Sequence, residues 1–102
     1  MKIKTIDINA KEWFDKVNGN SYFSAKITLN YGTEEAQTYD LPFQYGYSDH
    51  YIDMANQYLI KEGIIKGERH DNGCYSPLWR YCKDNKIILR TSKQANCKKR
   101  EL

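Results

Sequence analysis

Features that would assign a function directly are scarce in this 102-residue sequence. No apolar run approaches the roughly 18 residues of a membrane span, and the charged start of the chain lacks the apolar stretch of a signal peptide. We therefore expect a cytoplasmic protein with no membrane partner. The net charge is only +3, which excludes both a histone-like polycation and an acidic tail protein.

Cysteine is also scarce. Cys74, Cys82 and Cys97 are odd in number and widely spaced, so we expect reduced thiols rather than a disulfide framework. Together with His70 they could supply four zinc ligands. Because no Cys-x-x-Cys pair is present, a buried apolar role is the better interpretation of Cys82. The sequence therefore predicts no cofactor, with zinc as the alternative.

Motifs for catalysis are missing. The six glycines are scattered, so none of them forms a phosphate-binding loop. His50, which lies between Asp49 and Asp53, is the best candidate for acid–base catalysis. Acidic residues also favour a helix N-terminus for electrostatic reasons alone, and this simpler explanation covers the same residues. We therefore expect a protein that is not an enzyme.

What the sequence does contain is a strong hairpin signal at Asn18-Gly19. Such a pair predicts a two-residue turn, since both positions take a positive φ. Opposed residue numbers then sum to 37, so that Phe14 faces Phe23 and Lys11 faces Lys26. One face of this ribbon is apolar or aromatic apart from Glu12, and consists of Ile6, Ile8, Ala10, Glu12, Phe14, Phe23, Ala25, Ile27, Leu29 and Tyr31. The other face is mostly polar and carries Trp13 and Tyr22 as neighbours.

The remaining elements follow from breakers and periodicity. Residues 36–41 predict a third antiparallel strand that Pro42 ends, followed by a loop over residues 43–48. A main helix begins at Ser48 or Asp49, runs to Glu62, and is capped by Gly63. Ser76 as cap and Pro77 as first residue predict a short second helix to residue 84. Residues 86–91 predict a final strand.

Together these elements predict an α+β fold. We expect a curved antiparallel sheet, made of the long N-terminal hairpin and a third strand, with one main helix packed across it. A short second helix and a C-terminal strand complete a single domain over residues 1–91. Residues 92–102 form a basic C-terminal tail with little to bury, which makes this tail a candidate for disorder.

Charge and aromatic residues are unevenly distributed along the chain. Residues 1–57 carry five Lys against eight acids, whereas residues 58–102 carry eleven Lys or Arg against five acids. No Lys or Arg lies between Lys26 and Lys61, and this span holds six of the nine Tyr. Core-filling Tyr and solvated acids would produce the same pattern. Alternatively, an acidic, Tyr-rich middle provides a protein-binding surface, and a basic half contacts phosphates.

These two surfaces give two sets of candidate residues. The candidates for binding a partner are Tyr45, Tyr47, Asp49, His50 and Asp53. The candidates for contacting RNA or DNA phosphates are Lys86, Arg90, Lys93, Lys98, Lys99 and Arg100. Exposed Trp13 and Tyr22 could in addition stack on bases.

Two segments carry a family resemblance. The hairpin Trp-Phe-Asp-Lys-Val-Asn-Gly-Asn at residues 13–20 and the later Tyr45-Gly46-Tyr47 loop before Tyr51 resemble a group of small bacteriophage proteins. The similarity covers about the first sixty residues and offers no catalytic residue to carry over. It implies a phage or prophage product working in the cytoplasm of a bacterial host, where small phage proteins often inhibit host defence, as anti-CRISPR proteins do.

Our first hypothesis is therefore a non-enzymatic inhibitor that binds a bacterial nucleic-acid-handling complex, such as a CRISPR RNA-guided nuclease. The positively charged channels of these ribonucleoproteins would attract an acidic surface. The alternative is a phage accessory protein that binds RNA or DNA directly, through the basic half and the exposed aromatic residues. A third alternative is a small structural protein that self-assembles. The oligomeric state stays open in each case.

Overall fold

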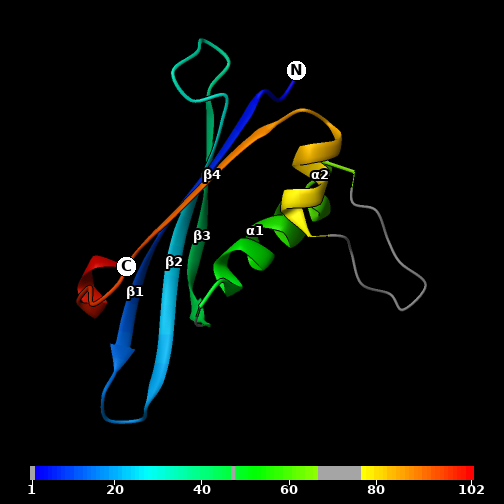
Figure 1. Cartoon of the computed structure of the whole chain (residues 1–102). Coiled ribbons are helices and arrows are strands. Elements are labelled where there is room, and N and C mark those ends of the chain that lie inside the picture. The colour runs from blue at the N-terminus through cyan, green and yellow to red at the C-terminus, as the bar shows by residue number, and fades with distance from the viewer. Residues whose placement is uncertain (1, 47, 67–76) are drawn as a thin grey trace.

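The structure, a computed structural model, describes residues 2–46, 48–66 and 77–102 and has the expected α+β architecture (Figure 1). The elements in chain order are β1 (Thr5–Asp15), β2 (Asn20–Leu29), β3 (Gln37–Tyr45), α1 (His50–Lys61), α2 (Leu78–Asp84), β4 (Ile88–Gln94) and the 3₁₀ helix η1 (Lys99–Glu101). The sheet order is β3-β2-β1-β4. Strands β1 to β3 are antiparallel as expected, whereas β4 is parallel to β1, so the sheet is mixed.

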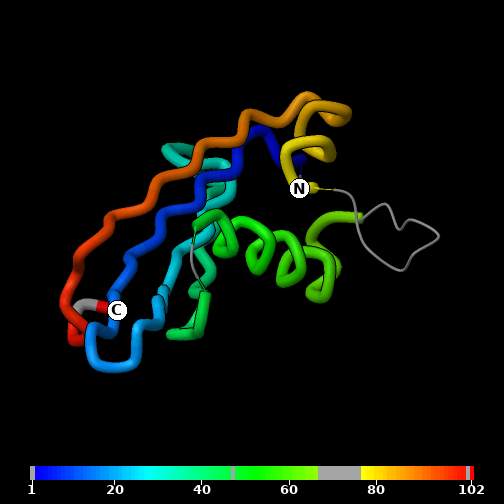
Figure 2. The backbone as a smooth tube through the Cα atoms, turned by 60° about the horizontal axis from the view of Figure 1, so that its bottom comes forward, coloured from blue at the N-terminus to red at the C-terminus, as the bar shows by residue number. Residues whose placement is uncertain are grey.

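Both helices lie against one face of the sheet, which we call the covered face (Figure 2). Alternate residues of β1 and β2 point into it, as the period of two requires. They form the core with helix residues such as Tyr51, Ala55 and Leu59, which recur at helical spacing. The predicted apolar ribbon face is therefore correct for the strand residues Ile6, Ile8, Ala10, Phe23, Ala25, Ile27 and Leu29. We call the opposite side of the sheet the open face.

The predicted hairpin register is wrong by two residues. Asp15 pairs with Asn20, and the connection is a four-residue loop rather than a two-residue turn. Of the Asn18-Gly19 pair only Gly19 has a positive φ, at 71°. The Asp15 carboxylate stabilises this longer loop because it accepts hydrogen bonds from the backbone N–H groups of Val17 and Asn18. A two-residue shift keeps every side chain on its face, so the face assignment survives.

The prediction that Pro42 ends the third strand is also wrong, since β3 continues to Tyr45. The pairing of β2 with β3 shifts by one residue between Phe23 and Ala25, so Pro42 and Phe43 both lie opposite Ser24. This is a β-bulge on an edge strand, where a proline costs no ladder hydrogen bond. After the bulge, Phe43 and Tyr45 both contact Tyr22 on the open face.

The helix boundaries agree closely with the sequence. Asp49 is the N-cap of α1, and Gly63 follows its C-cap with a positive φ of 72°. Pro77 precedes α2 as its N-cap instead of forming its first turn, and the expected cap Ser76 lies outside the described residues. None of the helices in the described part of the chain is long and apolar enough to cross a membrane.

The C-terminal residues continue beyond the expected strand. Strand β4 extends to Gln94, and the Cys97 N–H then donates to the Glu12 carbonyl oxygen at 2.9 Å. The chain turns over the end of β1 into η1, and Leu102 comes to lie at the open face. Residues 92–94 of the expected basic tail are therefore part of the sheet.

Candidate functional site

Four of the five predicted partner-binding residues meet at one surface hollow. Tyr45 reaches it from the end of β3, while Asp49, His50 and Asp53 reach it from the first turn of α1. The hollow has a volume of about 480 Å³, and Gly46 and Ser48 complete its lining. The fifth predicted residue, Tyr47, lies outside the described residues.

Gly46 lets the rims of this hollow approach each other. A Cβ atom at position 46 would lie 2.5 Å from His50 Cδ2 and 2.7 Å from Phe23 Cε1, closer than side-chain contacts allow. The His50 ring meets the Phe23 ring edge to face, with centroids 6.1 Å apart. His50 is thus partly a packing residue, which favours the structural interpretation of its position over the catalytic one.

The hollow keeps an acidic character although a lysine lies near it. Lys93 Nζ donates to the Ser48 carbonyl oxygen at 3.0 Å and to Glu12 Oε2 at 3.1 Å. The ion pair with Glu12 compensates the charge of Lys93, so the exposed Asp49 and Asp53 keep their negative charge uncompensated by it. This contact also explains Glu12, the polar exception that the sequence placed on the apolar face.

The predicted phosphate-binding residues do not form one surface. Arg90 lies on the open face and pairs with Asp7 at 2.7 Å, whereas Lys93 points to the covered face. Lys86 precedes β4 while Lys98, Lys99 and Arg100 follow it, which separates them by roughly 20 Å of strand. The six residues are therefore divided among four places, and Arg90 and Lys93 already have carboxylate partners.

The open face instead carries an aromatic cluster, which we define as Trp13, Tyr22, Phe43 and Tyr45. Tyr22 stacks on Phe43 with centroids 5.1 Å apart and planes inclined by 10°, and Trp13 stacks on Tyr22 at 5.6 Å. Tyr45 meets Tyr22 edge to face at 5.8 Å. Sequence reasoning placed Trp13 beside Tyr22 but missed Phe43, because it ended β3 at Pro42.

One predicted basic residue contacts this cluster. Lys99 Nζ lies 5.5 Å from the centroid of the Trp13 ring, within the range of a cation–π interaction. This contact connects η1 to the open face. A groove on the same face lies beside the aromatic cluster and is lined by Phe43. The volume of this groove is about 740 Å³.

Metal-binding residues do not gather in the described part of the chain. Among those residues, no group of three or more His, Cys, Asp or Glu side chains could hold a metal ion. Two of the candidate zinc ligands, His70 and Cys74, lie outside the described residues. Cys82 is buried, and burial raises the pKa of its thiol to about 11, which leaves it protonated and unreactive at neutral pH.

Comparisons with known proteins add no family to this geometry. No protein-family model, no curated protein and no solved structure matches the chain. The phage resemblance of the hairpin and the Tyr-Gly-Tyr loop stays a prediction, and the functional argument rests on the surfaces described above.

Proposed function

We propose that the protein is a non-enzymatic inhibitor of phage origin that binds a bacterial nucleic-acid-handling complex, such as a CRISPR RNA-guided nuclease. The observation that carries this proposal is the hollow at the start of α1, where Tyr45 meets Asp49 and Asp53. A nuclease that holds nucleic acid in a basic channel offers the complementary charge. The acidic hollow would compete for that channel.

The chemistry of the hollow fits a protein partner. Tyr45 is 54% exposed, and an exposed Tyr provides a large contact area at little cost in rotamer entropy. The two carboxylates beside it attract lysine and arginine side chains and speed the encounter with a basic surface. No catalytic role is needed, because occupying a nucleic-acid channel is enough to inhibit.

The experiment is capture of host complexes from bacteria with active CRISPR immunity, after nuclease treatment that removes bridging RNA and DNA. The wild-type chain should retain a protein component of a ribonucleoprotein or nuclease. The double variant D49N/D53N and the variant Y45A should each retain about tenfold less, since both remove central contacts. The captured complex, once purified, should cleave its target more slowly in the presence of the wild-type chain.

The matched control is E62Q/D84N, which also removes two exposed acidic charges but at helix ends away from the hollow. This control should capture as the wild type does, and thermal melting should show that all variants are folded. The proposal fails if the wild-type chain retains no such component, or if D49N/D53N retains it as strongly as E62Q/D84N.

A further inference from the structure

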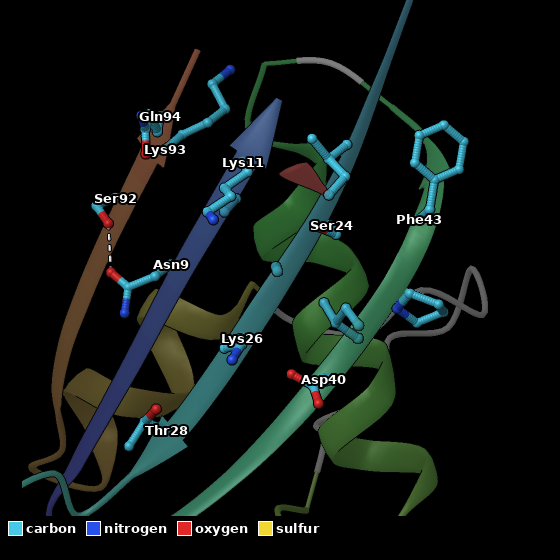
Figure 3. A pocket seen from close by; sticks show the side chains of 15 residues that line it. Asn9, Lys11, Ser24, Lys26, Thr28, Asp40, Phe43, Ser92, Lys93 and Gln94 are labelled. Atoms are coloured by element: carbon cyan, nitrogen blue, oxygen red, sulfur yellow. Dashed lines mark hydrogen bonds between the residues drawn. The ribbon is translucent and has the colours of Figure 1, made fainter. Parts of the chain in front are cut away.

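We propose that the groove on the open face is a separate binding site for single-stranded nucleic acid. The groove lies across all four strands, on the side of the sheet away from both helices (Figure 3). This proposal does not depend on the hollow at α1, because Lys11, Lys26 and Phe43, on which it rests, do not line the hollow.

The strand register explains how the groove is built. On the open face one row across the sheet consists of Ser92, Asn9, Lys26 and Asp40. The next row begins with Gln94, Lys11 and Ser24 and ends at the bulge, where Phe43 stands. The aromatic cluster lies beside the row of Gln94, Lys11 and Ser24. At the opposite end of the groove, the Arg90–Asp7 ion pair lies in the row next to that of Ser92 and Asn9.

The charge of the groove favours an anion. Lys11 and Lys26 are exposed, and among the described residues neither forms a salt bridge. They lie on adjacent strands in neighbouring rows, a diagonal separation of about 7–8 Å. Among the described residues that line the groove, Asp40 is the one with an acidic side chain, and Lys93 is already paired with Glu12. Lys11 and Lys26 thus outnumber the acidic side chain Asp40, which lies opposite Lys26 in the sheet.

The aromatic wall favours bases over a simple anion. Phe43 is 42% exposed, and Figure 3 shows the broad side of its ring on the same side of the sheet as Lys11 and Lys26. Tyr22 stacks against one face of this ring at a 10° inclination and so fixes its orientation. A base can stack on such a ring only when it is not paired in a duplex, so the geometry selects single strands.

The remaining lining suits a sugar–phosphate backbone. Ser24, Thr28 and Gln94 offer hydroxyl and amide groups to ribose and phosphate oxygens, while Asn9 and Ser92 are joined by a hydrogen bond. These groups can donate or accept without selecting one base. We therefore expect binding with little sequence preference.

The experiment is fluorescence anisotropy with a labelled single-stranded RNA of about a dozen nucleotides, the same DNA sequence, and the corresponding duplex, at 50 and 200 mM salt. The wild-type chain should bind the single strands more tightly than the duplex. With two phosphates neutralised, affinity should fall about sevenfold between the two salt concentrations. K11Q/K26Q should remove most of this salt dependence and weaken binding at low salt by about tenfold.

F43A provides a second, independent readout. It should weaken binding about tenfold while leaving the salt dependence unchanged, because it removes stacking and no charge. The matched control K61Q/K83Q removes two exposed lysines on the helices, and D49N/D53N alters only the hollow; both should bind as the wild type does. These variants separate failure of this site from failure of the proposed inhibitor function.

Three results would overturn the proposal. The first is the absence of single-strand binding by the wild-type chain at 50 mM salt. The second is equal binding by the wild type, K11Q/K26Q and F43A. The third is displacement of the RNA by an acidic peptide of equal charge, with the same dependence on Lys11, Lys26 and Phe43, which would assign the groove to an acidic protein segment.

Discussion

The two faces of the sheet are made by the same strands and differ in almost every other respect. On the covered face, β1 and β2 contribute side chains such as Ile8 and Ile27 that are inaccessible to solvent. On the open face, the intervening residues are charged, polar or aromatic, and they include both lysines and aspartates. The covered face determines the fold, because burying it is the main favourable term in folding. The open face contributes less to this term, and we propose that its side chains bind a ligand.

The largest difference between the two faces should appear in the free energy of unfolding when two neighbouring residues of β2 are replaced. Phe23 is 2% exposed on the covered face, so F23A should lower the free energy of unfolding by about 3–5 kcal/mol. Y22A, one residue away on the open face, should cost about 1 kcal/mol through lost ring stacking. Urea denaturation measures both. Equal losses would contradict the division of roles between the faces.

Gly46 tests the boundary where the covered face meets the hollow. G46A places a methyl group against His50 and Phe23, and should lower the free energy of unfolding by about 2 kcal/mol through overpacking. The double variant G46A/H50A removes one of the two obstructing rings and should recover part of this loss. Thermal melting of G46A, H50A and G46A/H50A tests the packing explanation, which requires the loss in the double variant to be smaller than the sum of the two single losses.

Two ion pairs join β4 to β1, one on each side of the sheet, so their contributions to stability can be compared. Lys93–Glu12 is partly buried on the covered side and bound also to Ser48, so E12Q should cost about 1.5 kcal/mol. Arg90–Asp7 on the open face leaves its arginine largely in solvent, so D7N should cost about 0.5 kcal/mol. Chemical denaturation at low and high salt should show the larger salt sensitivity for the Arg90–Asp7 pair. A D7N loss equal to that of E12Q would contradict the ranking.

The smallest effect concerns Asp15, the last residue of β1, whose carboxylate stabilises the hairpin loop. The side-chain hydrogen bond from Asn18 lowers the pKa of the Asp15 carboxyl below its usual value of 3.8. The stabilisation is therefore complete above the unfolded-state pKa of about 3.9 and is lost as pH falls through the lower folded-state pKa. D15N should flatten the loss of stability in this acid range, as followed by melting temperature against pH. An unchanged acid profile would exclude this contribution.

Much of the fold was predictable because it depends on local patterns. The alternation in β1 and β2 identified the buried side, and periodicity with Asp49 and Gly63 located α1. The register was not predictable from Asn18-Gly19 alone. A side chain outside the pair, Asp15, stabilises a longer loop by hydrogen bonds that no dipeptide rule contains.

The functional surfaces were predictable only in part for the same reason. Tyr45, Asp49 and Asp53 are close in the sequence, so their meeting in one hollow follows from a short loop before a helix. The separation of Arg90 from Lys93 does not follow from composition, since it depends on the strand alternation of β4. Phe43 belongs to the aromatic cluster because β3 continues past Pro42 through a bulge. The usual rule that proline ends a strand placed Phe43 outside the sheet.

The parallel pairing of β4 with β1 has a consequence for the order of folding. It joins Asp7 to Arg90 and Asn9 to Ser92, residues separated by 83 positions, whereas the hairpin joins near neighbours. Local hairpins close in roughly 1–10 μs, whereas a contact between distant residues carries a larger loop-closure cost and forms more slowly. We expect β4 to dock last, after α1 and α2. Before β4 docks, the edge of β1 carries unpaired backbone groups, and β4 therefore protects an edge that could otherwise pair with another chain.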